Sequence, residues 1–409
     1  MKSGYLSQYF EGVAAKRLSA VEANVEKSNQ HEFNGTLPLR RIFGDCDAEK
    51  RKFPTRFFWF GAENEGISNE GFVTWYDARA NHATRYECRL YFPTTEVSAL
   101  AREGDMMFVA KRTDGTVLVI VTAANSTIEN QLFWLFALQR PEGNAFEFSS
   151  IDDKSDQEVD FVVRFIFDEL GIDVEEPEAD GLDLLLEKFK GVMPSTLELS
   201  LYARETVKGI NPLDDADATL VAWMNQEEKL FRRLERHLIE QRLHDGFVEN
   251  GTADFDGFMK FSISVTQRRK SRAGYALERH ISQLFDIYKI RYSHGQVTEG
   301  NKKPDFVFPG IAEYRNISFP IESLTVLGVK TTSKDRWRQV LSEADRVPRK
   351  HLLTLEPSIS QNQTDEMIAS NLQLIVPRIT HESYNKKQRS WLMNVSEFME
   401  HVRERQQEI

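Results

Sequence analysis

The chain of 409 residues has few of the residues that form metal clusters or disulfide networks. Its two cysteines, Cys46 and Cys88, form neither a metal-ligand spacing nor a disulfide framework, which predicts reduced thiols and a cytoplasmic location. The nine histidines show no metal-binding spacing either. No glycine-rich loop precedes a Lys-Ser or Lys-Thr pair, which argues against ATP use. Because long apolar runs and a signal peptide are also missing, we expect no membrane partner.

The chain also has no excess of positive charge. The formal net charge is −11, which argues against a uniformly basic nucleic-acid binder but not against local basic surfaces. Much of the acid lies in residues 152–187, which hold fourteen Asp or Glu and two cations. The polar part of this stretch separates two apolar helical patterns, and its self-repulsion favours an extended chain. We therefore predict a hinge at 171–192 between domains at 1–170 and 193–409.

Two side chains in the C-terminal half are typical of metal-dependent cleavage of phosphodiesters. Asp305 opens an apolar strand at 306–308, and Lys330 follows the next apolar strand at 324–329. A carboxylate at this place would hold a hard cation such as Mg²⁺ through oxygen. The cation would activate water, and the lysine would stabilise the negative charge that develops on the phosphate.

A second carboxylate is needed, and its usual place is vacant. In the common nuclease arrangement it lies two residues before the lysine, but that position is Gly328 here. We predict that Glu343 replaces it, on a helix that begins at Lys334 behind a Ser333 cap. On such a helix Glu343 shares a face with Arg336. The sequence therefore predicts a metal site formed by Asp305 and Glu343.

A basic segment precedes these residues. Segment 267–280 (QRRKSRAGYALERH) contains five cations and one acid, and it continues as an amphipathic helical pattern. A helix N-terminus beside cations is an anion site, so we interpret the segment as a DNA phosphate contact. A solvated basic helix start is the alternative. The candidate contacts are Arg268, Arg269, Lys270 and Arg272.

At three segments the sequence resembles the EcoRII-type restriction endonucleases. They read RRKSRAG at 268–274, TEGNKKPDF at 298–306 and VKTTSKDRWRQ at 329–339, within a match from about Met193 to Pro377. The resemblance implies an α/β restriction-endonuclease-like fold of the PD-(D/E)XK type, with the second acid moved onto the following helix. It implies a type II enzyme that uses Mg²⁺ to cut double-stranded DNA at a palindromic CC…GG-type site.

The resemblance also implies roles for individual residues. By position, Asp305, Lys330 and Glu343 match the family's catalytic set, and Glu278 matches its auxiliary acid. Lys334, Asp335 and Arg336 match the family's base readers, which agrees with basic side chains donating to guanine and Asp accepting from cytosine. The alternative for Asp335 is a salt bridge to Arg336 or Arg338.

The centre of the recognition site stays open. In the family the central bases are flipped into a pocket with an arginine and an aromatic residue. The corresponding region here, 222–226, contains Trp223 but no arginine. Either the pocket is built otherwise or the central specificity differs.

The N-terminal part has a different pattern. Strands are expected at 56–60, 71–76 and 85–92, followed by a hairpin at 105–122 and a helix at 125–137. This predicts a mostly antiparallel barrel with flanking helices. The resemblance implies a DNA-binding pseudobarrel (B3-like) effector domain that inhibits the nuclease until it binds a second site. Candidate DNA contacts, each otherwise a solvated charge, are Arg79, Arg85 and Arg89, with Arg40 and Arg41.

The predicted function is therefore that of a homodimeric, Mg²⁺-dependent type II restriction endonuclease, because a palindromic site calls for a two-fold protein. The resemblance further implies a cognate DNA cytosine methyltransferase. A non-catalytic, sequence-specific DNA-binding regulator is one alternative, and the intact catalytic set argues against it. A structure-selective DNA repair nuclease is another, but it would not need base readers at 334–336.

Overall fold

A computed structural model of the chain describes residues 4–23, 31–61, 66–82, 84–151, 157–174, 182–249, 251–333 and 336–407. It divides into two compact units, Met1–Glu175 with Ser358–Gln361 and Glu176–Pro357 with Asn362–Ile409. The division falls inside the predicted hinge at 171–192. Part of that hinge is the helix α6 (Leu182–Phe189), so this part is not extended. No helix among the described residues is long and apolar enough to cross a membrane.

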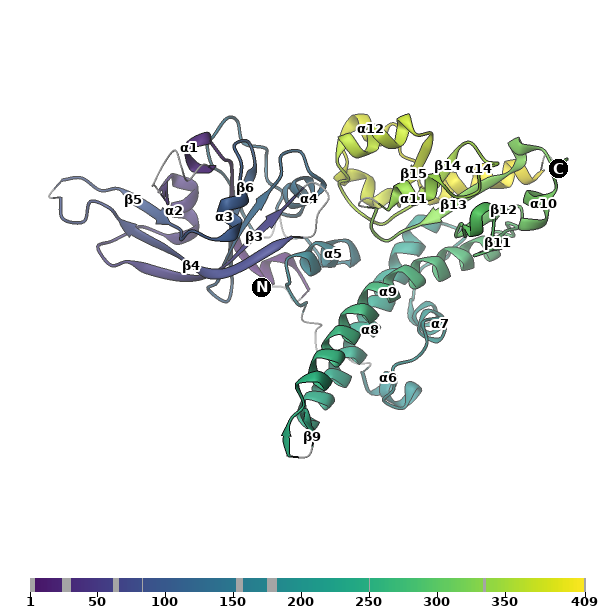
Figure 1. The fold of residues 1–409 in the computed structure, drawn as a ribbon, viewed down its shortest axis with the longest axis horizontal. Helices are drawn as coiled ribbons and strands as arrows, with labels where there is room; N and C mark the ends of the chain where they lie inside the picture. The colour runs from purple at the N-terminus through teal and green to yellow at the C-terminus, as the bar shows by residue number, and fades with distance from the viewer. Residues whose placement is uncertain are drawn as a thin grey trace. The chain divides into compact units, whose positions relative to one another are not determined.

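The first unit is built on an eight-stranded sheet of order β2-β5-β4-β3-β7-β6-β1-β8. Figure 1 labels its strands β3, β4, β5 and β6. Within the described ranges only the β3–β7 pair is parallel. The strands are β1 (Phe10–Arg17), β2 (Glu32–Asn34), β3 (Arg51–Phe60), β4 (Ile67–Asp77), β5 (Cys88–Tyr91), β6 (Met106–Arg112), β7 (Val117–Thr122) and β8 (Glu147–Ser150). The helices are η1 (Leu6–Gln8), α1 (Ala20–Ala23), α2 (Leu37–Phe43), α3 (Glu96–Leu100), α4 (Thr127–Leu135) and α5 (Phe161–Glu169).

The central strands of this sheet are buried on both faces. Phe108 and Ile120 pack with α4 and α5, whereas the adjacent Val109 and Val119 pack with α2 in a separate core. Successive side chains of a strand point to opposite faces. A strand that is covered on both sides therefore reads as an unbroken apolar run, as 117–122 (VLVIVT) does.

The sheet curls, but it does not close within the described residues. Phe33 of β2 and Phe146, next to β8, lie at opposite ends of the strand order, yet their ring centroids are 6.1 Å apart. No hydrogen-bonded pair joins β2 to β8 in the described part of the chain. The sheet is thus a half-barrel, and the B3-like pseudobarrel stays a prediction.

The prediction of two reduced cysteines is wrong for this structure. Cys46 and Cys88 form a disulfide that joins the loop after α2 to the first residue of β5. Gly35 lies directly against it, since a Cβ at this position would stand 2.2 Å from the Cβ of Cys88. The two cysteines are 42 residues apart, and only the folding of β3 and β4 between them brings them together.

The second unit contains a five-stranded mixed sheet of order β11-β12-β13-β14-β15. Its first three strands are antiparallel neighbours and its last three are parallel neighbours. Phe306 and Phe308 pack on Phe285 of α9, and Val307 and Val326 pack on the other face with α10. The predicted α/β architecture is confirmed at this level. The strands are β11 (Ser293–His294), β12 (Phe306–Phe308), β13 (Thr325–Val329), β14 (Lys350–Leu353) and β15 (Leu372–Ile375).

A helical hairpin precedes this sheet. The helices α8 (Ala216–Asp245) and α9 (Phe255–Ile287) run side by side to a tip formed by β9 (Val248–Glu249) and β10 (Thr252–Ala253) (Figure 1). The helices α6 and α7 (Thr196–Thr206) pack on it through Leu185, Leu199 and Leu230. The other short helices are η2 (Glu299–Asn301), α10 (Ile311–Arg315), η3 (Ile321–Ser323), α11 (Trp337–Leu341), α12 (Gln361–Ala369), η4 (Arg378–Ser383), α13 (Lys386–Arg389) and α14 (Val395–Gln407).

The helix α9 begins twelve residues before the basic segment that was predicted to start it. Segment 267–280 therefore lies in the middle of a helix, where the backbone N–H groups are already bonded. The prediction of an anion site at a helix N-terminus is wrong. Gly257 and the β-branched residues between 255 and 266 give weak helix propensity, and packing against α8 overrides it.

Candidate active site

Asp305 and Lys330 meet at one edge of the mixed sheet. The strands β12 and β13 are antiparallel, so Asp305, just before β12, lies beside the end of β13. Lys330 Nζ donates to Asp305 Oδ2 over 2.9 Å, and the N–H of Val329 donates to the same oxygen over 2.6 Å. Both side chains are mostly buried, with 21% and 16% of Lys330 and Asp305 exposed. The structure thus brings together the carboxylate and the lysine that the sequence singled out.

Gly328 shows why the second acid does not stand on the strand. A Cβ at position 328 would lie 2.5 Å from Cγ2 of Val340, closer than real Cβ atoms approach. The helix α11 therefore packs on β13 at a place where only glycine fits. Because Val340 is three residues before Glu343, this close packing holds the segment that carries Glu343 near the end of β13.

The helix that was predicted to carry Glu343 is shorter than expected. It spans Trp337–Leu341 with Arg336 as its N-cap. Glu343 lies in the turn after the helix, where its N–H donates to the carbonyl of Val340 over 3.1 Å. The expected helical face shared by Glu343 and Arg336 is therefore wrong, although Glu343 still reaches the site.

The electrostatics of Glu343 favour a bound cation. Burial and, after it, the charge of Asp305 raise the pKa of Glu343 to about 7, although Lys330 acts in the opposite direction. Its Oε2 atom is buried and has no hydrogen-bond partner among the residues that the structure describes. A hard cation between the carboxylates of Asp305 and Glu343 would satisfy this oxygen and neutralise two like charges. The donor set therefore fits Mg²⁺.

The candidate metal set contains two carboxylates, those of Asp305 and Glu343. Among the residues that the structure describes, no group of three or more His, Cys, Asp or Glu side chains is arranged to hold a metal ion. Mg²⁺ commonly keeps several waters and binds one or two carboxylates together with substrate phosphates. Two carboxylates at the sheet edge agree with that mode.

Glu278 reaches the same edge through a histidine that the sequence did not single out. Glu278 Oε2 lies 2.9 Å from His294 Nε2. His294 pairs with Phe306 across β11 and β12, and the N–H of Gly295 donates to the carbonyl of Asp305 over 2.9 Å. No local pattern marks His294, because its partner lies on α9, sixteen residues earlier.

The segment between β13 and α11 is anchored by a buried acid. The N–H and hydroxyl of Ser333 donate to Glu356 Oε2 over 2.5 Å and 2.9 Å, so Ser333 does not cap the helix as predicted. Both residues are buried, whereas Arg336 at the end of the segment is exposed. The predicted base readers Lys334 and Asp335 lie outside the described residues.

Comparison with known proteins agrees with this geometry. Residues 231–399 match the family described as "EcoRII C terminal". The chain is 38% identical over 232 residues to the type II restriction enzyme EcoRII of Escherichia coli, a match that covers 56% of this chain and 55% of that enzyme. The C-terminal half of the chain is thus similar to EcoRII. The resemblance noted in the sequence is therefore confirmed.

More distant matches are of the same kind. The chain is 24% identical over 194 residues to the type II restriction enzyme SsoII of Shigella sonnei, which covers 44% of this chain and 62% of that enzyme. It thus spans little more than half the length of these curated relatives. A solved structure, "Restriction endonuclease PspGI-substrate DNA complex", is similar over 53% of this chain and 95% of that chain, with 16% identity and a TM-score of 0.43.

The basic segment at 267–280 is only partly at the surface. Arg269 donates to Glu235 over 2.6 Å, and Glu235 is fully buried. Arg272 is 9% exposed, donates to the carbonyl of Pro194 and lies 5.2 Å from the ring centre of Phe231. The predicted phosphate contact therefore does not fit Arg272, which supports the packing of the helices. Arg268 is half-buried, and the side chain of Lys270 lies outside the described part.

Trp223 has an arginine neighbour that the sequence did not reveal. The guanidinium of Arg204, on α7, lies 5.7 Å from the Trp223 ring centre and donates towards Nδ1 of His280 over 3.1 Å. Nε2 of His280 lies 2.9 Å from Glu227, and burial lowers the pKa of His280. The arginine comes from a different helix, so the sequence around Trp223 contains no sign of it.

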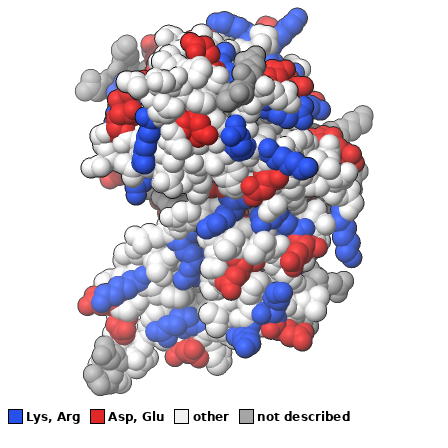
Figure 2. All heavy atoms as spheres, turned by 90° about the vertical axis from the view of Figure 1, so that its right-hand side faces the viewer, with Lys and Arg blue, Asp and Glu red and all other residues white. Residues whose placement is uncertain are grey.

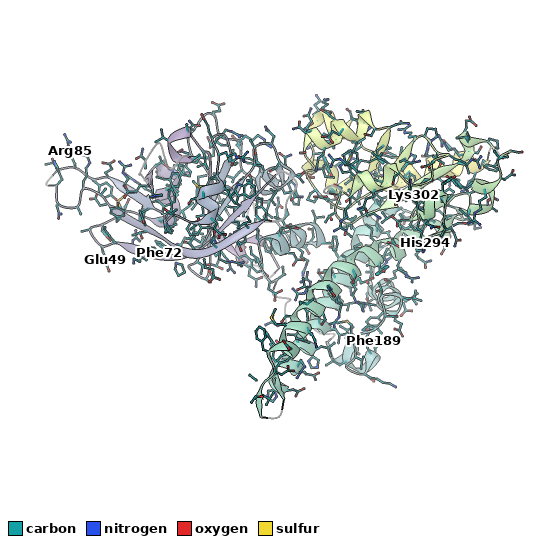
Figure 3. The ribbon with its side chains drawn as sticks, in the orientation of Figure 1. Glu49, Phe72, Arg85, Phe189, His294 and Lys302 are labelled. Carbon is teal, nitrogen blue, oxygen red and sulfur yellow. A yellow bond between two sulfur atoms is a disulfide. The ribbon has the colours of Figure 1, made fainter. Side chains whose placement is uncertain are left out.

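The candidate DNA contacts of the first unit lie around the β4–β5 loop. Arg79 and Arg89 both donate to Glu87, and the hydrogen bond from Arg79 is the main cause of a lowered pKa of Glu87. Arg85 is exposed at the end of the loop (Figure 3). Arg40 and Arg41 lie over the rings of Tyr86 and Phe148. On the face drawn in Figure 2, cations and acids are interspersed.

Proposed function

We propose that this protein is a type II restriction endonuclease that hydrolyses phosphodiester bonds of double-stranded DNA with Mg²⁺. The observation that carries the proposal is the convergence of Asp305, Lys330 and Glu343 at one edge of the mixed sheet. The homology of the C-terminal half to type II restriction enzymes supports it.

The chemistry divides among the residues of the site. A divalent cation held by Asp305 and Glu343 would activate water and neutralise charge on the phosphate. The ammonium group of Lys330, which Asp305 orients, would stabilise the charge that develops on a phosphate oxygen. The backbone of Val329 fixes Asp305 in turn. Glu278, oriented by His294, is the auxiliary acid.

Recognition is proposed to use the segment that follows β13. Lys334, Asp335 and Arg336 would read the outer C·G pairs of a palindromic CC…GG-type site, from a segment anchored by Ser333 on Glu356. The palindrome calls for a homodimer in which each protomer cuts one strand. Arg204 beside Trp223 would supply the arginine that the local sequence lacks for holding a flipped central base.

The remaining proposals concern the rest of the chain and its cellular setting. The first unit would be an effector domain that binds a second copy of the site through Arg79, Arg85 and Arg89 and relieves inhibition of the nuclease. A cognate DNA cytosine methyltransferase would protect the host DNA. Both activities would act in the cytoplasm.

Digestion of a pool of plasmids with random inserts tests the proposed function against its alternatives. With Mg²⁺ we expect discrete double-strand cuts at one sequence, and none with EDTA. Sequence-specific binding without any cutting would favour a non-catalytic regulator. Cuts that follow junctions or gaps rather than sequence would favour a repair nuclease.

Two arginine substitutions separate base reading from phosphate contact. Arg336→Ala should cost roughly 1–3 kcal/mol of discrimination at one G·C position. Arg268→Ala should weaken binding to all sequences similarly and flatten the salt dependence. Arg268 is the better phosphate test, because Arg269→Ala would leave the buried Glu235 without its partner. Binding selections over randomised sites at several salt concentrations measure both effects, and identical sequence profiles would contradict the assigned roles.

A further inference from the structure

The turn that carries Glu343 has an unfavourable backbone conformation. Ala344, the next residue, has a φ of +52°, in the left-handed region, and it is fully buried. A residue other than glycine is disfavoured in this region and persists only where the surroundings enforce it. Within the described part of the chain, the side chain of Glu343 has a buried oxygen without a hydrogen-bond partner. Its position therefore depends on what holds the backbone of the turn.

Lys350 holds this turn from the side of the sheet. It is the first residue of β14 and only 4% exposed. Its Nζ atom donates to the carbonyl of Ala344 over 2.5 Å and to the carbonyl of Val347. A buried ammonium group is stable only with such partners. One side chain thus binds two carbonyls of the turn and connects the turn to a strand next to β13.

Arg346, a residue of the same turn, binds it to α10 and the segment after it. Its guanidinium donates to the carbonyls of Tyr314, Asn316 and Phe319, which form α10 and the segment after it. The hydroxyl of Tyr314 accepts from the N–H of Arg346 over 3.3 Å and donates to Glu299 over 2.6 Å. The turn is therefore bound to β14 through Lys350 and to the region of α10 through Arg346, by hydrogen bonds to backbone carbonyls.

We propose that Lys350 is a positioning residue of the cleavage reaction, which holds the Ala344–Val347 turn so that the carboxylate of Glu343 faces Asp305 in a metal-binding geometry. Lys350 itself touches neither DNA nor metal. Its role rests on the proposed nuclease function. Mg²⁺ demands near-ideal octahedral geometry, so a small displacement of one carboxylate weakens the site.

The first test follows the turn itself in the protein without metal or DNA. Lys350→Met keeps an unbranched side chain of similar length and removes the ammonium group. We expect amide hydrogen exchange in residues 342–349 to accelerate at least tenfold, with the exchange of β13 unchanged. Arg349→Met is the matched control, since Arg349 is the adjacent, exposed cation and donates to Gln373 instead of the turn. Unchanged exchange in Lys350→Met would overturn the proposal.

The second test follows cleavage and binding. With Mg²⁺, Lys350→Met should cut its site about a hundredfold more slowly than the wild type, while DNA affinity stays within threefold. Mn²⁺ uses the same oxygen ligands. The variant should therefore cut at least tenfold faster with Mn²⁺ than with Mg²⁺. A general structural defect would lower affinity and cleavage together and would not respond to the metal. That parallel loss would overturn the positioning role.

A milder variant covers the case in which Lys350→Met does not fold. Tyr314→Phe removes the hydroxyl that links Arg346 to Glu299 and keeps the buried ring. It should also show faster exchange of the turn and partial rescue of cleavage by Mn²⁺. Each change should be about a tenth of the change in Lys350→Met. Wild-type behaviour of this variant, with an unfolded Lys350→Met, would assign Lys350 to stability alone. If the wild-type protein cuts no DNA at all, the nuclease proposal fails, whereas the exchange experiment still decides whether Lys350 holds the turn.

Discussion

Glu343→Gln should abolish DNA cleavage and leave DNA affinity within about tenfold of the wild type. Binding depends on phosphate and base contacts, whereas Glu343 acts on the metal. Loss of one of two metal-binding carboxylates should lower the cleavage rate about 10³-fold. Gel-shift titration and single-turnover cleavage measure the two quantities separately. Glu400→Gln, on an exposed face of α14, is the matched control.

The same substitution should stabilise the metal-free protein at alkaline pH. Burial and the charge of Asp305 raise the pKa of Glu343 from 4.5 to about 7, so the folded protein binds this proton more tightly than the unfolded chain. The wild type therefore loses stability as pH rises from about 4.5 to about 7. Glutamine cannot ionise and avoids this loss, which amounts to about 1–3 kcal/mol at pH 8 after allowance for solvent screening.

Thermal melting in EDTA at pH 5 and pH 8 checks this effect. Glu343→Gln should melt at a higher temperature than the wild type at pH 8 and at nearly the same temperature at pH 5. Equal melting temperatures at both values would mean that the carboxylate is not destabilised by burial. A cleavage rate like that of the wild type would remove Glu343 from the metal site.

Removal of the first unit should accelerate the cutting of DNA that carries a single site, by about tenfold or more. The effector domain is proposed to inhibit the nuclease until it binds a second site. A chain that begins at Gly181 should therefore cut one-site plasmids faster than the full protein, and the full protein should cut two-site plasmids faster than one-site plasmids. A folded truncation that cuts one-site DNA more slowly than the full chain would contradict autoinhibition.

The start of the truncation matters because α6 packs on the helical hairpin. Leu185 is fully buried with Leu199 and Leu230, and the ring of Phe189 lies 5.5 Å from that of Tyr202. A chain that begins at Gly191 lacks Leu185 and Phe189 and should be less stable by about 2–5 kcal/mol. Urea unfolding of the two truncations compares them directly. The boundary predicted at 193 would thus remove part of the core of the second unit.

The sequence alone determined the main features of the candidate site. Asp305 and Lys330 each adjoin an apolar strand, and two antiparallel neighbours bring such positions to one sheet edge. The glycine at position 328 already indicated that the second acid had to come from elsewhere. These are local patterns, and they depend on strand periodicity and on chain order more than on packing. The long sequence segments that resemble the EcoRII-type enzymes made the same region recognisable.

Only the tertiary structure decided the contacts between distant segments. The Cys46–Cys88 disulfide, the pairing of His294 with Glu278 and the approach of Arg204 to Trp223 each join residues far apart in the chain. Local secondary-structure propensity does not predict such pairs, because the energy that selects them comes from the packing of whole helices and strands. The same packing extends α9 through a weakly helical stretch and buries Arg272, which sequence patterns had placed at a surface. It also places Glu343 in a turn in place of the predicted helix, and Lys350 and Arg346 bind that turn to β14 and to the region of α10.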